Sequence, residues 1–494
     1  MFIVLAIDSE LWGLIHMSSL MSRYVASCGV QTTIGLAQET LRIYNAECAK
    51  KNVKPDPEII QHIQAARANE DPFTVLSLKN RSFTKAHIET LVPILTESVS
   101  RFLVIADFEG SLKEDTVDLV VDAVYHSRTI EVLNLQNCKE IGTKTCTTLS
   151  SMIKNGHSLR FLNISQNEIS STNLSLIVKA LGSQYSVLQV LKASGITPTT
   201  SVPQIIPELC QSLSTNTTLL TLSLADDHLT PSSADSLSVV LENTIPLPPA
   251  PTPLAQGMSE EQDHTDVSLI TGDTRFINSL NDVPQTMFMY SSQLAALDFR
   301  MNQMGDSGLQ AISKALKTNN TLLSLVLWSN RITAAGITHL CAALKENTTL
   351  QNLELGCNQI GTGGTTELVS LLEVNRNITA LGVAQADLSS DDLVSLSGVL
   401  ADPACSLFRL DLRNNPRIGF RGISKLVEAI ETNTRIQCIA LDVDKLIEHS
   451  SPSEKAEMQK QLTRLQSRTT SNVDAFIKAN DTHSHDAAQT TVFP

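Results

Sequence analysis

Apolar residues recur along this chain in one register, in which leucine-like residues alternate with polar ones and the run ends at an asparagine. Three consecutive copies show it most clearly: LLSLVLWSNRI at 322–332, LQNLELGCNQI at 350–360 and ITALGVAQADL at 378–388. Their first apolar residues, Leu322, Leu350 and Ile378, follow one another at a constant interval. Self-similarity at a fixed period predicts a stack of repeats, which presents an extended surface rather than enclosing one cavity.

The register can be traced over most of the chain and gives twelve repeat starts. They are Phe73, Val99, Ile130, Leu159, Leu188, Leu219, Leu294, Leu322, Leu350, Ile378, Leu407 and Ile436. The interval from Leu219 to Leu294 is more than twice as long as the intervals on either side. The excess coincides with a Pro-rich stretch, so we expect the stack to be interrupted by an insertion rather than by a domain boundary.

Each repeat predicts one short strand and one helix. Leu325 and Leu327 alternate with Ser324, Val326 and Trp328, the period of two expected for a strand with one face in the core. In GLQAISKALKTN at 308–319 the apolar residues follow helical spacing. We expect Gly308, Gly336 and Gly422 to form tight turns just before such helices.

The asparagine that ends the register lies where the chain leaves the strand, and we call this position the Asn slot. The amide of an Asn there can satisfy backbone groups of neighbouring turns. The slot holds Asn167, Asn302, Asn330, Asn358 or Asn415, and we expect Cys138, Asp107, Asp227 and Asp444 to occupy it in other repeats.

Helices in this pattern also tend to end at Asn, namely Asn216, Asn243, Asn319, Asn347, Asn375 and Asn433. Because Asn tolerates the left-handed conformation that closes a helix, we expect these residues to act as C-caps. Four asparagines, Asn216, Asn319, Asn347 and Asn377, also begin Asn-x-Thr sequons. The alternative, N-glycosylation of a secreted protein, is less favoured because no export signal accompanies the sequons.

Units of about 28 residues with a full helix in each resemble the ribonuclease-inhibitor type of leucine-rich repeat. This type includes ribonuclease inhibitor, Ran GTPase-activating protein, the repeat domains of NOD-like receptors and the actin-binding part of tropomodulins. The resemblance covers residues 73–443. It implies an α/β fold, a leucine-rich-repeat solenoid or horseshoe, with a parallel sheet on the concave face and helices on the convex face.

The repeats are expected to lie between two caps, because an end repeat would otherwise expose its apolar face. The predicted organisation is an N-terminal helical cap at 1–70, repeats 1–6 at 73–244, a flexible Pro-rich insertion at 245–291, repeats 7–12 at 292–443, a C-terminal cap helix at 444–479 and a disordered tail at 480–494. The segment YNAECAKKNVKPDPEIIQHI at 44–63 resembles the one that precedes the first repeat in some centrosome- or cilium-associated leucine-rich-repeat proteins.

Two of these segments leave an alternative open. Met458, Leu462 and Leu465 form one apolar stripe, which favours a docked cap helix over an amphipathic helix that binds a partner. The insertion contains Pro246 and Pro249 at PxxP spacing, so a ligand for an SH3-type domain is conceivable, although a solvated loop is favoured.

Composition narrows the class of partner and the compartment. The formal net charge is −14, which argues against nucleic acid and anionic membranes as partners. The nine Cys are scattered without a CxxC, which favours free thiols in a reducing compartment. The apolar run at the N-terminus is too short for a secretory signal and no basic residue precedes it, so we expect a cytoplasmic protein, for which association with the cytoskeleton is left open.

No catalytic motif stands out. HExxH, GxSxG and GxGxxG are absent, as is a His/Cys spacing suited to zinc, so we predict no enzyme activity, no catalytic residue, no cofactor and no metal. One relative activates a GTPase, but the corresponding early turns, KASGITPTT at 192–200 and ISQNEISST at 164–172, contain no Arg. Regulation of a small GTPase is therefore the second hypothesis.

The first hypothesis is a protein-interaction scaffold in a cytoskeletal, ciliary or signalling complex. Residues that face away from the core line the concave face, where large and charged side chains gather in the later repeats. Trp and Arg are enriched among interface hot spots, so we expect Trp328 to be the anchor, unless neighbours cover it. The predicted partner-binding residues are Asp298, Arg300, Trp328, Glu354, Arg409, Asp411 and Arg413. Smaller or mixed side chains occupy the same positions in early repeats, such as Val132, Asn134, Phe161, Asn163, Thr221 and Ser223.

Overall fold

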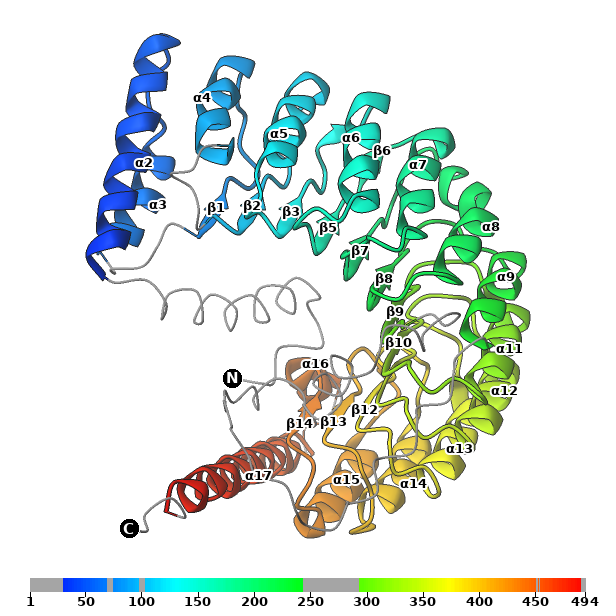
Figure 1. Ribbon diagram of the computed structural model, residues 1–494. Coiled ribbons are helices and arrows are strands. Elements are labelled where there is room, and N and C mark those ends of the chain that lie inside the picture. Colours follow the sequence, from blue (N-terminus) through cyan, green and yellow to red (C-terminus); the bar gives the residue numbers. More distant parts are fainter. Residues whose placement is uncertain are drawn as a thin grey trace, which may run out of the picture. The chain divides into compact units, whose positions relative to one another are not determined.

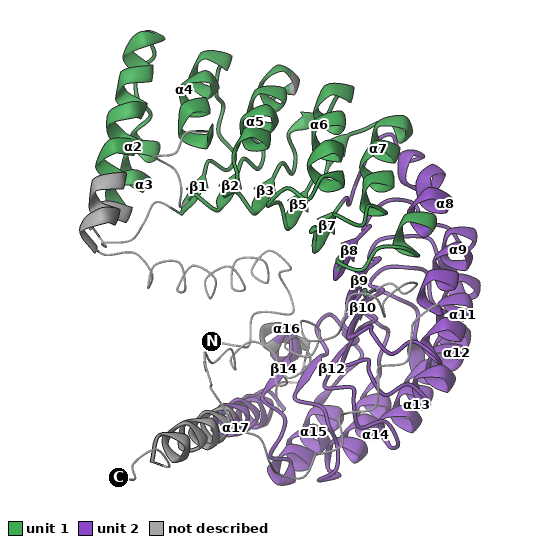
Figure 2. Ribbon diagram, in the orientation of Figure 1, with its two compact units in different colours: residues 1–192, 211–219, 243–293 green, residues 193–210, 220–242, 294–494 purple. Residues whose placement is uncertain are grey.

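The computed structural model describes residues 30–68, 74–96, 103–242, 293–449, 452 and 454–489. The chain forms two compact units (Figure 2). Unit 1 consists of residues 1–192, 211–219 and 243–293, and unit 2 of residues 193–210, 220–242 and 294–494. Of the predicted segments, Phe73, Val99 and the insertion at 245–291 lie outside the described residues.

Unit 1 begins with two helices and continues with alternating strands and helices (Figure 1). The helices are α2 (Val30–Lys50), α3 (Pro57–Ala68), α4 (Lys85–Thr96), α5 (Glu114–His126), α6 (Thr143–Lys154) and α7 (Ser171–Leu181). The strands are β1 (Val75–Ser77), β2 (Ile105–Asp107), β3 (Val132–Asn134), β5 (Phe161–Asn163) and β7 (Val190–Lys192), which pair in parallel in this order. A second, two-stranded sheet joins β4 (Lys139–Glu140) to β6 (Asn167–Glu168).

Unit 2 repeats the same alternation. Its strands β8 (Thr221–Ser223), β9 (Ala296–Asp298), β10 (Ser324–Val326), β11 (Asn352–Glu354), β12 (Ala380–Gly382), β13 (Arg409–Asp411) and β14 (Cys438–Ala440) form a parallel sheet in sequence order. Its helices are α9 (Pro231–Glu242), α11 (Gly305–Leu316), α12 (Ala334–Leu344), α13 (Gly361–Leu372), α14 (Ser390–Leu400), α15 (Phe420–Thr432), α16 (Val443–His449) and α17 (Lys455–Gln489). Helix α8 (Ser201–Leu213) carries residues of both units.

The spacing of the repeats therefore predicts the alternation of strands and helices correctly within each unit. All the predicted starts except Val99 stand just before a described strand of the main parallel sheet, at the same offset each time. Across the long interval Leu222 pairs directly with Leu297, so the insertion interrupts the chain but not the sheet of unit 2. Central strand residues such as Leu325 and Leu353 are fully buried, and their neighbours are only partly buried, as the period of two predicts.

One repeat start is wrong. Strand β2 begins at Ile105, so the start of its repeat is Leu103 and not Val99. Residues 102–106, FLVIA, are continuously apolar and show no alternation, so the sequence does not fix the register here. Asp107 is consequently the last residue of the strand, and Ser111 takes the Asn slot and donates from its hydroxyl to the Leu78 carbonyl.

The Asn slot works as expected where Asn is present. In Asn302, Nδ2 donates to the carbonyls of Leu224 and Phe299 at 2.8 and 2.9 Å, while Oδ1 accepts from the amides of Asp227 and Leu229. Each slot therefore joins one turn to the preceding turn. Cys138 and Asp227 do occupy the slot, buried like the asparagines, but Asp444 does not, because it lies inside α16.

The asparagines at helix ends form a second ladder rather than left-handed caps. Among Asn216, Asn319, Asn347, Asn375 and Asn433, none has a positive φ. Instead, Asn347 donates to the carbonyls of Leu316 and Asn319 and accepts from the amides of Thr349 and Leu350. Left-handed backbone occurs instead at residues just before the Asn slots, including Met301, Ser329, Cys357, Gln385 and Asn414.

The three glycines expected in turns lie inside helices. Gly308 belongs to α11, Gly336 to α12 and Gly422 to α15. A Cβ on Gly336 would overlap the Asp306 carboxylate of the preceding repeat, so the small residue allows adjacent turns and helices to approach closely.

Both ends of the repeat stack carry helices. In unit 1, Tyr44 and Cys48 of α2 are buried, and the Tyr44 hydroxyl accepts from the Asp56 amide at 2.9 Å. In unit 2, Met458, Leu462 and Leu465 of α17 are buried, and α17 packs against α15. The apolar stripe is thus docked rather than free.

The C-terminal helix is longer than predicted. It extends to Gln489, so the expectation of a disordered tail from residue 480 is wrong for 480–489. The segment is polar, but there is neither Gly nor Pro between Pro452 and Gln489, so nothing in this stretch interrupts the helix. The eight Cys within the described residues are free thiols, and no described helix is long and apolar enough to cross a membrane.

Candidate partner-binding site

The predicted partner-binding residues lie in or just after strands β9–β13 of unit 2. Helices α9 and α11–α15 lie on one side of this sheet (Figure 1), and strand alternation directs these residues to the other side. We call this side the inner face. The pairing places Asp298, Val326, Glu354, Gly382 and Asp411 in one row across β9–β13. Arg409 lies two residues before Asp411 on β13, and Arg300, Trp328 and Arg413 follow their strands.

The arginines of this face are paired with acids of their own repeats or of a nearby one. Arg300 Nε lies 3.0 Å from both carboxylate oxygens of Asp298. Arg413 Nη2 lies 2.6 Å from Asp411 Oδ2, and Arg409 Nη2 lies 3.7 Å from Glu354 Oε1. These pairs hold the side chains in fixed positions and leave a surface of alternating charge.

Glycines one repeat later make room for the two large side chains at the centre. A Cβ on Gly356 would overlap the Trp328 ring, so the indole lies against the Gly356 backbone. A Cβ on Gly382 would overlap the Glu354 carboxylate in the same way. Gly382 therefore leaves room for the Glu354 side chain.

Burial divides the predicted residues into two groups. Arg409 and Asp411 are only 5% and 4% exposed, although they face away from the core. The side chains of Arg300 and Arg413 are 36% and 39% exposed, and Trp328 is half-buried. A partner could contact Trp328, Arg300 and Arg413 directly, whereas Arg409 and Asp411 position Glu354 and Arg413.

Glu354 is the titratable group most affected by this environment. Burial raises the pKa of Glu354 to about 7, and the nearby Arg409 only partly counteracts it because the ion pair is longer than a hydrogen bond. Arg409 Nη1 has no hydrogen-bond partner among the described residues. The hydrogen bond with Asp411 raises the pKa of Arg413, so that guanidinium stays charged.

The inner face of unit 1 is different in chemistry. Val75, Ile105, Val132, Phe161 and Val190 form an apolar row across its five strands. The next row is polar and internally bonded, since Asn134 donates to Asp107 at 3.0 Å and the Lys192 ammonium lies 5.6 Å from the centre of the Phe161 ring. These side chains satisfy one another, so they offer fewer free groups than the face in unit 2.

Sequence reasoning missed two features of the region. It did not identify Gly356 and Gly382 as supports, although each stands next to a large residue one repeat earlier. It also missed Asp442, whose charge acts on Arg413, because the last repeat is degenerate.

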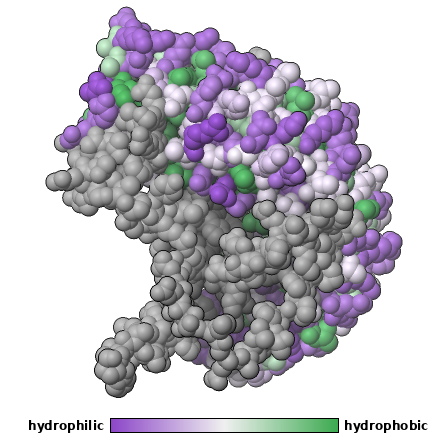
Figure 3. Space-filling model, viewed as in Figure 1, coloured by the Kyte–Doolittle hydropathy of each residue, from purple (hydrophilic) through white to green (hydrophobic). Residues whose placement is uncertain are grey.

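Outside this region, hydrophilic side chains predominate on the side of unit 1 seen in Figure 3, where apolar ones are scattered singly. Within the described residues no cluster of His, Cys, Asp or Glu could hold a metal ion.

Comparison with known proteins identifies the repeats. A family model of the leucine-rich repeat matches residues 291–313 and 346–369. Protein phosphatase 1 regulatory subunit 37 of Danio rerio is 26% identical over 144 residues, which is 29% of this chain. The chain spans 16% of the length of that curated relative.

Solved structures show weaker likenesses. The yeast complex of Rad7 and Elc1 has a TM-score of 0.45 at 14% identity, covering 90% of this chain and 95% of that one. Leiomodin-1 actin-binding site 2 has a TM-score of 0.30 at 16% identity, covering 35% of this chain and 95% of that one. No argument about function follows from values this low.

This chain is a leucine-rich-repeat protein, as its tandem register, its strand-and-helix repeats and the two matched segments show. Its repeats are suited to protein–protein interaction.

Proposed function

We propose that the chain is a non-catalytic interaction scaffold whose protein partner docks on the inner face of unit 2. The observation that carries the proposal is the half-buried Trp328 ring, which rests on Gly356 in a region that also holds the Arg300–Asp298 and Arg409–Glu354 ion pairs. A rigid aromatic side chain surrounded by oriented Arg–carboxylate pairs is typical of the centre of an interface. The ribonuclease-inhibitor subtype is part of this proposal, supported by a full helix in most repeats.

The roles of the site residues follow from their exposure. Trp328 would supply the apolar anchor, and the half-exposed Arg300 and Arg413 would form hydrogen bonds to the partner. Asp298, Asp411 and Arg409 would hold these groups and Glu354 in place. The mixed charges favour a protein with matching charges over nucleic acid.

The test begins with proximity labelling in cells to identify the partner, followed by affinity measurements on the purified pair. Trp328→Ala should weaken binding by about 2 kcal/mol or more, because it removes the anchor. The unfolding free energy should change little, since the ring lies on the inner face rather than in the core. Tyr185→Ala removes an aromatic side chain that is 64% exposed in unit 1 and serves as the matched control.

Two results would contradict the proposal. If binding survives both Trp328→Ala and Arg413→Glu, the interface lies elsewhere on the chain. If Trp328→Ala unfolds the protein, the ring has a structural role and cannot be assigned to a partner.

The similarity to a phosphatase regulatory subunit favours a second candidate, that the partner is a protein phosphatase 1 catalytic subunit. Co-purification with that subunit, and a change in its activity toward phosphoprotein substrates, would support this candidate. Regulation of a small GTPase remains a prediction from family resemblance alone, and stimulated GTP hydrolysis across a panel of GTPases would test it.

A further inference from the structure

The turns that follow the strands of unit 2 stack on one another through their main chains. The amide of Met301 donates to the Trp328 carbonyl at 2.7 Å, and Ser329 does the same to Gly356 at 2.9 Å. The series continues from Cys357 to Ala384 and from Gln385 to Arg413, at 2.7 and 2.8 Å. Each turn therefore offers hydrogen-bond donors to the turn of the next repeat.

An apolar column runs through the same turns. Ile332, Ile360, Leu388 and Ile418 occupy the same place in four successive repeats, and all are buried. The Asn slots run parallel to this column, where Asn415 Oδ1 accepts from the amides of Ala386 and Leu388 at 3.0 and 3.1 Å. Each turn is thus completed by an Asn and an aliphatic residue from its neighbour.

The last repeat continues neither the series of main-chain hydrogen bonds between turns nor the apolar column. Between β13 and α15 the chain has residues 412–419 for its turn, whereas between β14 and α16 it has only 441–442. Asp444, expected in the next Asn slot, lies in α16. A side chain takes the place of the next main-chain hydrogen bond in the series. The Asn414 amide donates to Asp442 Oδ2, at 2.5 Å, instead of to a carbonyl of the next turn.

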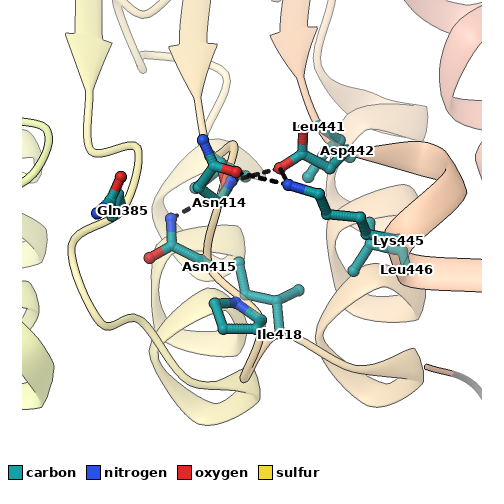
Figure 4. A pocket seen from close by; sticks show the side chains of 10 residues that line it. Gln385, Asn414, Asn415, Ile418, Leu441, Asp442, Lys445 and Leu446 are labelled. Atoms are coloured by element: carbon teal, nitrogen blue, oxygen red, sulfur yellow. Dashed lines mark hydrogen bonds and ion pairs between the residues drawn. The ribbon is translucent and has the colours of Figure 1, made fainter. Parts of the chain in front are cut away.

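The shortened turn leaves a hollow at the end of the column. A cavity of about 460 Å³ lies beside Ile418, and its lining includes Gln385, Leu412, Asn414, Leu441 and Leu446 (Figure 4). The Lys445 ammonium donates to Asn414 Oδ1 at 2.9 Å and lies at its rim. Helix α17 packs on α15 instead and contributes nothing to the lining, so the C-terminal cap leaves the layer of turns open.

We propose that this hollow is a docking site for a protein partner that inserts an aliphatic side chain, Ile or Leu, carried on a turn. The occupant would take the position that Ile418 fills for the preceding repeat, with the partly exposed Leu441 and Leu446 as its apolar contacts. The amide side chains of Gln385 and Asn414 would bond to the main chain of the inserted turn. This site is separate from the inner face and does not depend on the function proposed for it.

The chain itself supplies the probe, a backbone-cyclised peptide that copies residues 327–334, with Asn330 and Ile332 in their turn. Titrated into the full-length protein, it should shift the methyl NMR signals of Ile418 and Leu446 and leave the interior Ile360 methyl unchanged. The same peptide with Ile332→Asp should bind at least about tenfold more weakly, because a carboxylate would be placed against the apolar lining.

Filling the cavity should abolish binding. Leu446→Trp and Gln385→Trp fill it from opposite walls, so one variant remains informative if the other folds poorly by thermal melting. Val374→Trp, at a site 59% exposed on another part of unit 2, is the matched control and should bind normally.

Several outcomes would overturn the proposal. They are equal binding of the two peptides, shifts confined to other methyl groups, absence of any shift at millimolar peptide, and unchanged binding by both cavity-filling variants. Dimerisation that depends on concentration and disappears in Leu446→Trp would mean that a second copy, rather than a separate partner, occupies the site.

Discussion

Asp227 stands in the Asn slot, where the following repeat has Asn302, and its carboxyl group is poorly satisfied there. The side chain is fully buried, and Oδ1 accepts from the Ile196 amide at 2.9 Å. Oδ2 has no hydrogen-bond partner among the described residues, because the groups around an Asn slot are mainly carbonyl oxygens that need a donor. Burial accordingly raises the pKa of Asp227 to about 8.

Asp227→Asn should therefore stabilise the fold. Its Nδ2 could donate to the carbonyls of Leu224 and Ala193, the equivalents of those that Asn302 bonds. We expect the free energy of unfolding at pH 7 to rise by about 1–3 kcal/mol, measured by urea denaturation.

The pH dependence provides an independent check on this substitution. Because the folded pKa of Asp227 lies above the value of 3.8 for an unperturbed Asp, its contribution is complete below pH 3.8 and is lost as the pH rises through about 8. Asp227→Asn should remove a slope of up to about 1.4 kcal/mol per pH unit in this window. Asp235→Asn, at an exposed position of α9, is the control and should change neither stability nor slope; an unchanged slope in Asp227→Asn would contradict the account.

Glu354 should produce a second pH effect, on the inner face. Its folded pKa of about 7 is raised from 4.5, so the carboxyl stabilises the fold below pH 4.5 and this contribution is lost as the pH rises through about 7. Glu354→Gln should flatten the unfolding free energy between these values, by about 3 kcal/mol at most.

The slope is the quantity to measure here, because Gln would also leave Arg409 without an anionic neighbour and change stability at every pH. Glu346→Gln is a suitable control, since that side chain is 62% exposed and pairs with Lys317 on the surface. A slope equal to that of the unaltered protein would show that Glu354 has an ordinary pKa.

Among the elements, α17 is the one whose contribution can be isolated. Its buried stripe packs on α15, and polar groups reinforce the contact: Arg468 donates to the Ile430 carbonyl at 3.2 Å and Asn472 to the Ile436 carbonyl at 2.7 Å. A cap of this kind covers the apolar face that the last repeat would otherwise expose.

Leu462→Ala should lower the free energy of unfolding by about 2–4 kcal/mol, as expected for a buried Leu replaced by Ala. Lys460→Ala, nearby on the same helix and 67% exposed in its side chain, should have almost no effect. Equal effects of the two substitutions in chemical denaturation would mean that α17 is not docked in solution.

At the scale of the whole molecule, the insertion between β8 and β9 is the main irregularity of the chain. The prolines clustered between Pro246 and Pro253 predict an extended, flexible segment outside the stack, which remains a prediction because these residues are not described. Limited proteolysis should first cut within 246–290, and the fragments should stay associated, because β8 pairs directly with β9. A first cut within a repeat helix, with the insertion intact, would contradict this prediction.

The sequence determines the repeated elements because they follow from local spacing. A Leu at every second position and an Asn at a fixed distance specify a strand and a turn, which the structure confirms from Leu322 to Asn415. Local spacing fails where it is ambiguous, as between Val99 and Leu103, or where the repeat is degraded, as at Asp444.

The candidate site was predictable only in part. Alternation alone placed Asp298, Trp328, Glu354 and Arg413 on the inner face, because side-chain direction depends on the position within a strand. Their environment depends on neighbours one or two repeats away, which no local pattern encodes. Tertiary structure alone decided that Arg409 and Asp411 are buried, that Trp328 rests on Gly356, and that the last turn leaves a hollow beside Ile418. The physical reason is that periodicity sets which way a side chain points, whereas burial and charge depend on what the adjacent repeats place around it.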